Sequence, residues 1–455
     1  MKSGTQQTAK QLLYSGGIAE IVDHPTPVTL SFLQTWFSGY GSFGTAMQLL
    51  GLPFHSSTDS ILICVDGELL VDVSAEERML YADTVLGYGT QTDHTHLPSL
   101  SIHPLRLLSP SHIWQTIKLI AVQSTWTANP DGIITIMNQM VDAVAVPKRS
   151  LTFIELDTHI NTVVMPAVIA VGYVAEYFHQ YSLHQSGAQK ATIESYISSK
   201  VAETDWIFHS VADQYLVKSG EKSFDWYMDR YGNRADRDFE ITCPRWYEIP
   251  ERIREQIDKS IQTPQSRIGE LKNDSLKQLA DTVISVQRIR SRLKQKALGY
   301  IALLRRQIMD LVRETDALPN ATREQLLSGN PITITLPVPV PTTQQPTPVQ
   351  NSGRGTPISK GTVTGTVIQV TSSLMDIPAG TIAIFPNASP EYSILFPKCA
   401  GIIFQKGGQT SHGAIVAREY GIPAIVEKTA LAIPNNVRLT INGEQGTWQI
   451  VTLQS

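Results

Sequence analysis

Apolar residues recur at intervals of three and four positions through residues 274–314, a period that predicts one long helix, or two helices with a break near Gly299. The rest of residues 1–329 is also mostly helical in pattern. Residues 60–73 are an exception, because two apolar runs flank an Asp-Gly pair and predict a β-hairpin. We therefore expect residues 1–329 to form a mainly α-helical substrate-binding domain with a small β-hairpin element.

The pattern changes to that of a small α/β domain in residues 356–455. Short β-rich runs, such as residues 362–370 and 381–385, are separated by Pro and Gly turns. A further apolar run at residues 400–404 leads through a Gly-Gly turn into a helical pattern over residues 412–420. Strands that alternate with a helix in this way are typical of an α/β fold.

Residues 330–355 separate these two parts and are rich in Pro, Thr, Gln and small polar residues. This composition predicts an inter-domain linker. Because Pro-rich segments favour the extended polyproline II conformation, such a linker permits a large excursion of the C-terminal domain.

The charge balance and the apolar pattern argue against a nucleic-acid-binding protein and against a membrane protein. The 455 residues include 37 basic and 41 acidic side chains, which gives a formal net charge of −4. A duplex-coating protein normally carries a strongly basic domain, so no nucleic-acid partner is expected. No uninterrupted apolar run is long enough for a membrane span, and the N-terminus lacks a signal-peptide core. We therefore expect a cytoplasmic protein without a membrane partner.

The cysteines and histidines do not predict a metal site. Cys64, Cys243 and Cys399 lie too far apart in sequence to form a CxxC pair or a disulfide scaffold. His94 and His96 alternate as two ligands on a strand would, but no third ligand accompanies them at a fixed spacing. We interpret this pair as part of a polar loop and expect this chain to bind no metal.

The most informative segment is residues 407–426, where a predicted strand ends in a glycine turn before a helix. Thr410 and Ser411 are expected to cap that helix and to place His412 at its N-terminus. Backbone N–H groups and the positive end of the helix dipole attract anions at this position, and a neutral imidazole is nucleophilic. The segment therefore predicts that His412 takes up a phosphoryl group. The alternative is an ordinary capping or core histidine.

The run TSHGAIVAREYGIPAIV closely resembles the phosphohistidine signature of the phosphoenolpyruvate-utilising, or dikinase, superfamily, which includes rifampicin phosphotransferase and phosphoenolpyruvate synthase. The resemblance implies a swivelling α/β domain in which His412 carries the phosphoryl group. Gly413 stands where alanine is more usual. Turns at residues 378–380, 387–391 and 441–443 also resemble that domain, so the likeness extends across it.

A second segment, YGNRADRDFEITCPRW, resembles the part of the helical substrate domain of rifampicin phosphotransferase that typically runs Gly-His-Arg-Gly-Pro-Gly-Glu and ends Pro-Arg-Trp. Asn233 replaces the usual histidine, so a titratable ring becomes an amide that cannot act as a base. The candidates for binding the phosphoryl group or an anionic acceptor are Arg234, Asp238, Glu240 and Arg245. The alternative is that the arginines form structural ion pairs with Asp236, Asp238 or Glu240.

The resemblance also implies which parts of the reaction lie elsewhere. Relatives that work alone carry an ATP-grasp nucleotide-binding module, for which this sequence has no room, and no GxxxxGK[ST] phosphate loop occurs in it. Unless the sequence is part of a longer chain, we therefore expect a separate ATP-grasp protein to bind ATP and Mg²⁺ and to phosphorylate His412.

The same resemblance implies that His412 passes the phosphoryl group to a hydroxyl or carboxylate of a small organic acceptor. The chain would then be the substrate and phosphohistidine component of a split phosphotransferase or ligase. The alternative from another functional class is a non-catalytic phosphohistidine carrier or regulatory protein.

Overall fold

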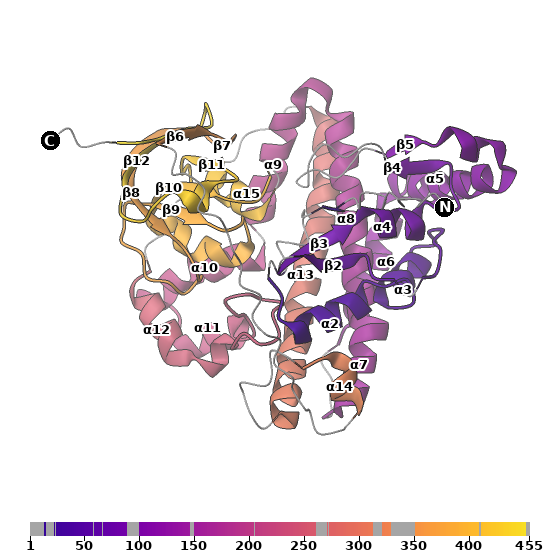
Figure 1. Ribbon diagram of the computed structural model, residues 1–455, viewed down its shortest axis with the longest axis horizontal. Coiled ribbons are helices and arrows are strands. Elements are labelled where there is room, and N and C mark those ends of the chain that lie inside the picture. The colour runs from indigo at the N-terminus through magenta and orange to yellow at the C-terminus, as the bar shows by residue number, and fades with distance from the viewer. Residues whose placement is uncertain are drawn as a thin grey trace, which may run out of the picture.

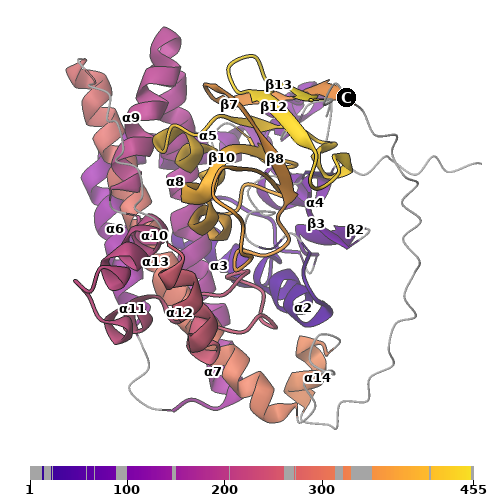
Figure 2. The same ribbon diagram turned by 90° about the vertical axis from the view of Figure 1, so that its left-hand side faces the viewer.

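The computed structural model describes residues 13–14, 22, 24–57, 59–65, 67–88, 100–145, 150–203, 205–260, 271, 273–312, 321–328, 351–408 and 411–451. They form a helical body and a C-terminal domain built on a mixed sheet, which lie side by side in Figures 1 and 2. Thr410, His94, His96 and residues 330–350 lie outside the described residues, so what the sequence indicates for them stays a prediction.

The N-terminal part of the body combines short helices with a three-stranded sheet in the order β1-β3-β2. β2 and β3 form the predicted antiparallel hairpin, in which Leu62 lies opposite Val71 and Val65 opposite Glu68. The elements of this part are β1 (Leu13–Tyr14), α2 (Pro27–Trp36), α3 (Ser42–Leu49), β2 (Leu62–Val65), β3 (Glu68–Asp72), α4 (Val73–Leu80), β4 (Leu86–Tyr88), β5 (Leu100–Ile102), η1 (Pro104–Leu108), α5 (Pro110–Ala128) and α6 (Pro130–Ala143).

Two long helices, α8 and α13, pack along each other at the centre of the body. α13 is one unbroken helix of 38 residues, so the alternative of a break near Gly299 is wrong. Buried residues at helical spacing continue on both sides of that glycine, which explains why it does not end the helix. The elements of this part are α7 (Phe153–His159), the π-helical turn η2 (Ile160–Val164), α8 (Met165–Gln185), η3 (Gly187–Gln189), α9 (Lys190–Ala202), α10 (Trp206–Lys218), α11 (Phe224–Tyr231), η4 (Trp246–Glu248), α12 (Pro250–Asp258), α13 (Asp274–Leu311) and α14 (Arg323–Ser328).

Helices α7 and α8 form a continuous stretch, Phe153–Gln185, whose length and composition alone would allow it to cross a membrane. However, 56% of its most apolar window is buried inside the structure. Such burial against other helices is typical of the core helix of a soluble protein.

The C-terminal domain is an eight-stranded mixed sheet in the order β6-β13-β12-β8-β9-β10-β11-β7. The four strands from β8 to β11 are parallel to one another, and the outer strands pair antiparallel. β6 falls inside the range predicted as linker, yet it pairs with β13 in the sheet. The elements are β6 (Ser352–Arg354), β7 (Thr356–Ser359), β8 (Thr362–Gln369), β9 (Thr381–Phe385), the 3₁₀ helix η6 (Pro390–Lys398), β10 (Cys399–Phe404), α15 (His412–Glu419), β11 (Ala424–Val426), η7 (Ala430–Ala432), β12 (Arg438–Asn442) and β13 (Thr447–Ile450).

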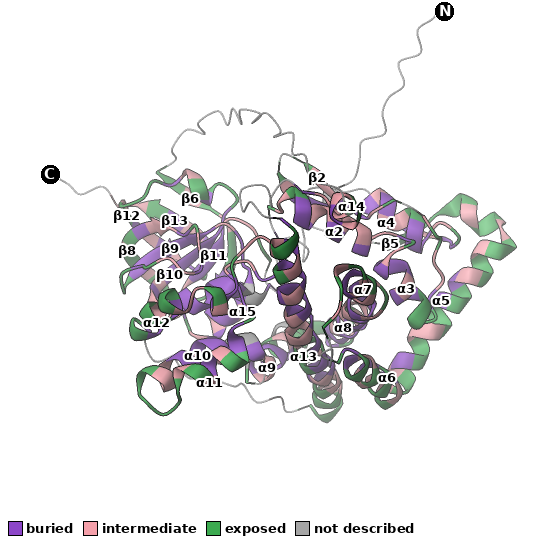
Figure 3. Cartoon of the chain, turned by 90° about the horizontal axis from the view of Figure 1, so that it is seen from below, coloured by how far each residue is buried: buried purple, intermediate pink, exposed green. Residues whose placement is uncertain are grey.

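The two faces of this sheet pack into different cores. Ile402 and Phe404 belong to a hydrophobic cluster that continues into the helical body, whereas Ile403 between them belongs to a second cluster within the domain. This alternation follows from the two-residue period of a strand. In Figure 3 the buried residues concentrate on the strands, on α15 and on the inward sides of α8 and α13. The sheet domain is therefore docked on the helical body through an apolar face.

Candidate functional site

The predicted phosphohistidine segment forms the turn between β10 and α15. Gly407 has φ of +138°, and a Cβ at this position would lie 2.9 Å from the Cβ of Ala388, so the turn requires glycine. Ser411 is the N-cap residue, and α15 begins at His412. The Ser411 hydroxyl does not cap the helix, as the sequence suggested, because it donates to the Gly408 carbonyl at 2.7 Å instead.

A second loop of the same domain, residues 387–391, is hydrogen-bonded to the start of α15. The Gly413 amide donates to the Ala388 carbonyl at 2.9 Å, which satisfies one of the free N–H groups of the first helical turn. A Cβ on Gly413 would lie 3.0 Å from this carbonyl oxygen and from the Phe404 ring. Even the methyl group of alanine would be crowded here, which agrees with a glycine where the family usually has alanine. The loop then leads into η6, which packs against α10.

On the helical body, Arg234 and Asp238 lie in a buried loop between α11 and η4. Arg234 donates to the Ser210 hydroxyl at 2.6 Å, and its second terminal nitrogen lies 3.4 Å from the Asp238 carboxylate. Its guanidinium also lies over the rings of Trp206 and Trp246, at 5.6 and 4.9 Å from their centroids. The Arg234 Nε is buried and finds no hydrogen-bond partner among the described residues. A buried cation with a donor to spare is suited to binding an anion.

The surroundings of Asp238 favour its ionised form. Burial alone would raise the pKa of Asp238, but attraction by Arg234 and Lys294 and a hydrogen bond from the Ala235 amide outweigh it and hold this pKa below its usual range. Asp238 is therefore an anion in the folded chain.

Glu240 and Arg245 belong to a separate hydrogen-bonded group in the same loop. Glu240 accepts hydrogen bonds from the hydroxyls of Thr26, Thr29 and Thr242 at 2.6 to 2.8 Å, so it ties the loop to α2. Arg245 donates to the carbonyls of Asp238 and Glu240 at 2.6 and 2.8 Å. Both side chains are fully buried, and the Nε of Arg245, like that of Arg234, finds no hydrogen-bond partner among the described residues.

Asn233, the residue that replaces the usual histidine, lies at the surface of the loop and is exposed. It is the neighbour of the fully buried Arg234. The structure thus brings Arg234 and Asp238 together, keeps Glu240 and Arg245 nearby in a second group, and places Asn233 outside both.

Sequence analysis did not single out Glu391, which reaches this cluster from the C-terminal domain. It is 6% exposed, and burial together with repulsion by Asp238 raises the pKa of Glu391 to about 8. Its place in the loop 387–391 could be recognised from the sequence, but its electrostatic interaction with Asp238 arises only because the two parts are docked.

Further contacts across the same interface hold the C-terminal domain in place. α15 packs against α9, where the Ser199 hydroxyl donates to the Glu419 carboxylate at 2.8 Å. Lys406 lies 2.7 Å from Glu68 of the β-hairpin. The loop before β9 contacts the body as well, since the Ser373 amide donates to Asp236. The interface therefore spans α9, α10, the hairpin and the loop that carries Arg234.

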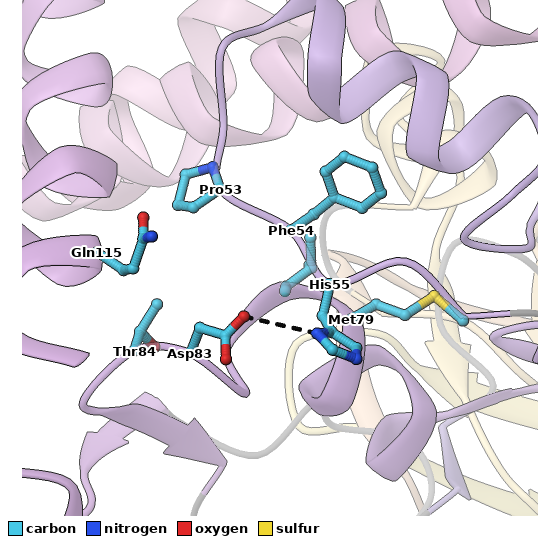
Figure 4. A pocket seen from close by; sticks show the side chains of 8 residues that line it. Pro53, Phe54, His55, Met79, Asp83, Thr84 and Gln115 are labelled. Atoms are coloured by element: carbon cyan, nitrogen blue, oxygen red, sulfur yellow. Dashed lines mark ion pairs between the residues drawn. The ribbon is translucent and has the colours of Figure 1, made fainter. Parts of the chain in front are cut away.

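Two cavities open on the helical body. One of about 100 Å³ lies between the loop after α3, α4 and α5, where the His55 Nδ1 and the Asp83 carboxylate lie 3.6 Å apart (Figure 4). The other, of about 330 Å³, lies between the start of α10 and α13 and is lined by Trp206, His209 and Arg292, among others. Trp206 is also the ring beneath Arg234, so this second cleft adjoins the buried cluster.

Among the described residues, no three His, Cys, Asp or Glu side chains gather in a way that could hold a metal ion.

Comparison with known families identifies both regions. Residues 377–446 match the PEP-utilising enzyme mobile domain, and residues 197–318 match the rifampicin phosphotransferase fourth domain. The first match contains α15 with its preceding turn, and the second contains Arg234 and Asp238. The resemblance to this superfamily is confirmed.

Individual relatives agree with these matches. The chain is 36% identical over 101 residues to rifampicin phosphotransferase from Streptomyces sviceus, which is 22% of this chain and 12% of the relative. It is 32% identical over 99 residues to rifampicin phosphotransferase from Bacillus subtilis, 21% of this chain and 11% of the relative. A probable phosphoenolpyruvate synthase from Staphylothermus marinus is 31% identical over 99 residues, 20% of this chain and 12% of the relative. The matches thus span about an eighth of these relatives' length.

Proposed function

We propose that this chain, which belongs to the PEP-utilising superfamily, is the substrate and phosphohistidine component of an ATP-dependent phosphotransferase or ligase. The observation that carries the proposal is the match of residues 377–446 to the mobile domain, in which the phosphohistidine signature begins helix α15 at His412. The docking of this domain beside a buried Arg–Asp cluster on the helical body supports an acceptor site at that interface.

In the proposed reaction, a nitrogen of His412 takes up a phosphoryl group and later gives it to an oxygen of the acceptor. A P–N bond breaks as a P–O bond forms, and the imidazole is regenerated. If the acceptor is a hydroxyl, its proton is released during transfer. If the acceptor is a carboxylate, the product is an acyl phosphate, which permits a subsequent ligation.

Arg234 is the proposed electrostatic partner of the phosphoryl group. Its buried guanidinium has an Nε donor with no partner among the described residues and lies over two indole rings. A preorganised cation of this kind stabilises the negative charge that spreads over the phosphoryl oxygens during transfer. Thr410, Ser411 and Asp238 complete the proposed phosphoryl-binding region, whereas Glu240 and Arg245 support the loop that carries it.

The cleft of about 330 Å³ beside Trp206 is the proposed place for the acceptor. Its size is within the range of small-molecule sites, and its lining combines an indole ring with two cationic side chains, Arg230 and Arg292, and one carboxylate, Glu203. Because the cations outnumber the carboxylate, this lining suits a small organic molecule that carries a negative charge. ATP and Mg²⁺ are assigned to an ATP-grasp protein rather than to the residues of this chain.

Phosphoryl labelling tests the proposal. The chain is incubated with radiolabelled ATP, Mg²⁺ and a cognate ATP-grasp protein, and the label is followed in acid and in alkali. We expect an acid-labile, alkali-stable label that is lost in His412→Ala. A label that persists in this variant contradicts the proposal. A label that forms but reaches no small molecule in the complete reaction would instead support a carrier without catalytic function.

A further inference from the structure

A large apolar surface stays open to solvent on the side of the helical body that faces away from the C-terminal domain. Of the 16 large hydrophobic side chains that are exposed in the described part of the chain, nine lie within residues 100–120. This range comprises β5, η1 and the start of α5. In Figure 1, β5 and α5 lie at the right and the sheet domain lies at the left. Exposed apolar residues that are scattered singly need no explanation, but such a concentration indicates an interaction surface.

Helix α5 is apolar on two opposite faces. One face packs into the core of the body through Leu119 and Trp126. The outer face carries a row of exposed isoleucines, Ile113, Ile117 and Ile120, and Figure 3 shows this helix at the edge of the molecule. The intervals of four and three residues in this row are those of a seam between two helices. Since the outer face of a solvated helix is normally polar, this face is suited to pack against a further helix.

The exposed apolar area is close to that of a stable protein interface. Trp114 lies next to the isoleucine row on α5, and Leu105 and Leu108 belong to η1, the turn that directly precedes this helix. The exposed fractions of these three residues and the three isoleucines range from 38% to 82%. The six residues thus present on the order of 700 Å² to solvent, whereas one partner contributes about 800 Å² to a stable interface.

The composition of this surface favours a second copy of the chain as its partner. Lys118 is the single charged side chain of α5, and it lies over the Trp114 ring at 5.8 Å. Helices that bind lipid surfaces usually carry several cations, so a membrane is disfavoured. The segment 89–99, which joins β4 to β5, is too polar to cover the surface, because Leu97 is its single large apolar residue. A second copy offers a matching apolar area, since two-fold symmetry brings the same surface of both chains together.

We propose that this chain forms a homodimer in which α5 packs antiparallel against α5 of a second copy, around a two-fold axis near Ile117. Ile117 is the middle residue of the row, so an axis at this position brings Trp114 close to Ile120 of the partner subunit, and every such contact occurs twice. Because the sheet domain lies on the other side of the body in Figure 1, this dimer leaves the contact between sheet domain and body unchanged. The proposal therefore does not depend on the phosphoryl relay.

Sedimentation velocity of the full chain tests the proposal. At chain concentrations from about 1 to 100 μM, we expect a reversible shift from the mass of one chain to twice that mass. Ile117→Glu places a carboxylate in the apolar interface, so this variant should sediment as one chain throughout. Ile154→Glu is the matched control, because Ile154 is an exposed residue of α7, which lies well below α5 in Figure 1, and it should dimerise normally. An unmodified chain that stays monomeric, or an Ile117→Glu variant that still dimerises, overturns the proposal.

Cross-linking locates the interface even if Ile117→Glu does not fold. In a chain whose Cys64 and Cys243 are replaced by serine, Ile117→Cys places one thiol from each copy close to the two-fold axis. A short bis-maleimide should then join two chains in high yield, whereas Ile154→Cys in the same background should give little cross-linked dimer. Equal yields from the two variants contradict the proposal, because α5 would then not lie at the dimer interface.

Discussion

At the residue scale, Glu240 shows how one buried carboxylate joins distant parts of the chain. It accepts the Thr26 amide at 3.0 Å and the Thr29 hydroxyl at 2.6 Å, both more than 200 positions away. Burial opposes its ionisation, but these hydrogen bonds outweigh the penalty and lower the pKa of Glu240. Glu240 was a candidate site residue because it belongs to the Tyr231–Trp246 motif. The structure gives it a different role, because its hydrogen bonds support the loop that carries Arg234.

Glu240→Gln should therefore destabilise the fold. The amide NH₂ would face hydroxyl and N–H donors, so we expect a loss of about 1–3 kcal/mol in the free energy of unfolding, measured by urea denaturation. Glu251→Gln is the matched control, because that side chain is 87% exposed, and it should change stability by less than about 0.5 kcal/mol. Equal effects of the two substitutions would contradict this role.

Comparing Glu240→Gln with the unmodified chain at several pH values gives a second test of this role. Because the folded-state pKa of Glu240 is lowered, its ionised form stabilises the fold above the usual carboxyl pKa, and this contribution is lost as pH falls through the lowered value. Unfolding free energies measured between pH 7 and 3 should fall less steeply in Glu240→Gln than in the unmodified chain. Identical slopes would show that Glu240 does not contribute.

At the element scale, the sequence pattern predicted the helices and strands whose formation depends on neighbouring residues in the chain. The three- and four-residue period of α13 and the two-residue period of the hairpin follow from backbone geometry, so both could be recognised in the sequence. The start of β6 could not, because its three residues form a strand only by pairing with β13. The hydrogen bond from the Ser411 hydroxyl to the Gly408 carbonyl could not be predicted either, since a serine before a helix usually caps that helix.

The turn before α15 offers a test with a neighbouring control. Gly407 has a positive φ and no room for a Cβ, whereas Gly408 has open space around it and no positive φ. Gly407→Ala should cost roughly 1–3 kcal/mol of stability by thermal or urea unfolding and should slow phosphorylation of His412. Gly408→Ala should stay within about 0.5 kcal/mol of the unmodified chain. If Gly408→Ala proves the more damaging, the described geometry of the turn is incorrect.

At the scale of the whole molecule, the predicted linker joins two anchored ends. On one side α14 is tied to α7 by Arg323, which contacts both oxygens of Asp157 at 2.8 and 2.6 Å. On the other side β6 is part of the sheet. Figure 1 shows α14 at the bottom of the helical body and β6 at the upper left, in the sheet domain. The linker itself stays a prediction. The sequence could not show where the domain docks, because docking depends on side chains brought together from many elements.

Locking the docked state should stop the relay. Ser199 and Glu419 meet across the interface at 2.8 Å, so cysteines at both positions can be bridged by a short, reducible bis-maleimide in a chain whose Cys64 and Cys243 are replaced by serine. We expect the bridged double variant to resist phosphorylation by the ATP-grasp protein and to recover when the bridge is reduced. Ser199→Cys alone, treated in the same way, should be labelled normally. Equal labelling of the locked chain would mean that the domain need not leave the body.

The central claim is that His412 carries the phosphoryl group, and peptide mass spectrometry at neutral pH tests it most directly. After incubation with ATP, Mg²⁺ and the ATP-grasp protein, the account predicts one phosphorylated peptide that spans the start of α15, with the modification on His412. A chain that stays unmodified under conditions in which the ATP-grasp protein is active, or that carries the phosphoryl group on another residue, would contradict it.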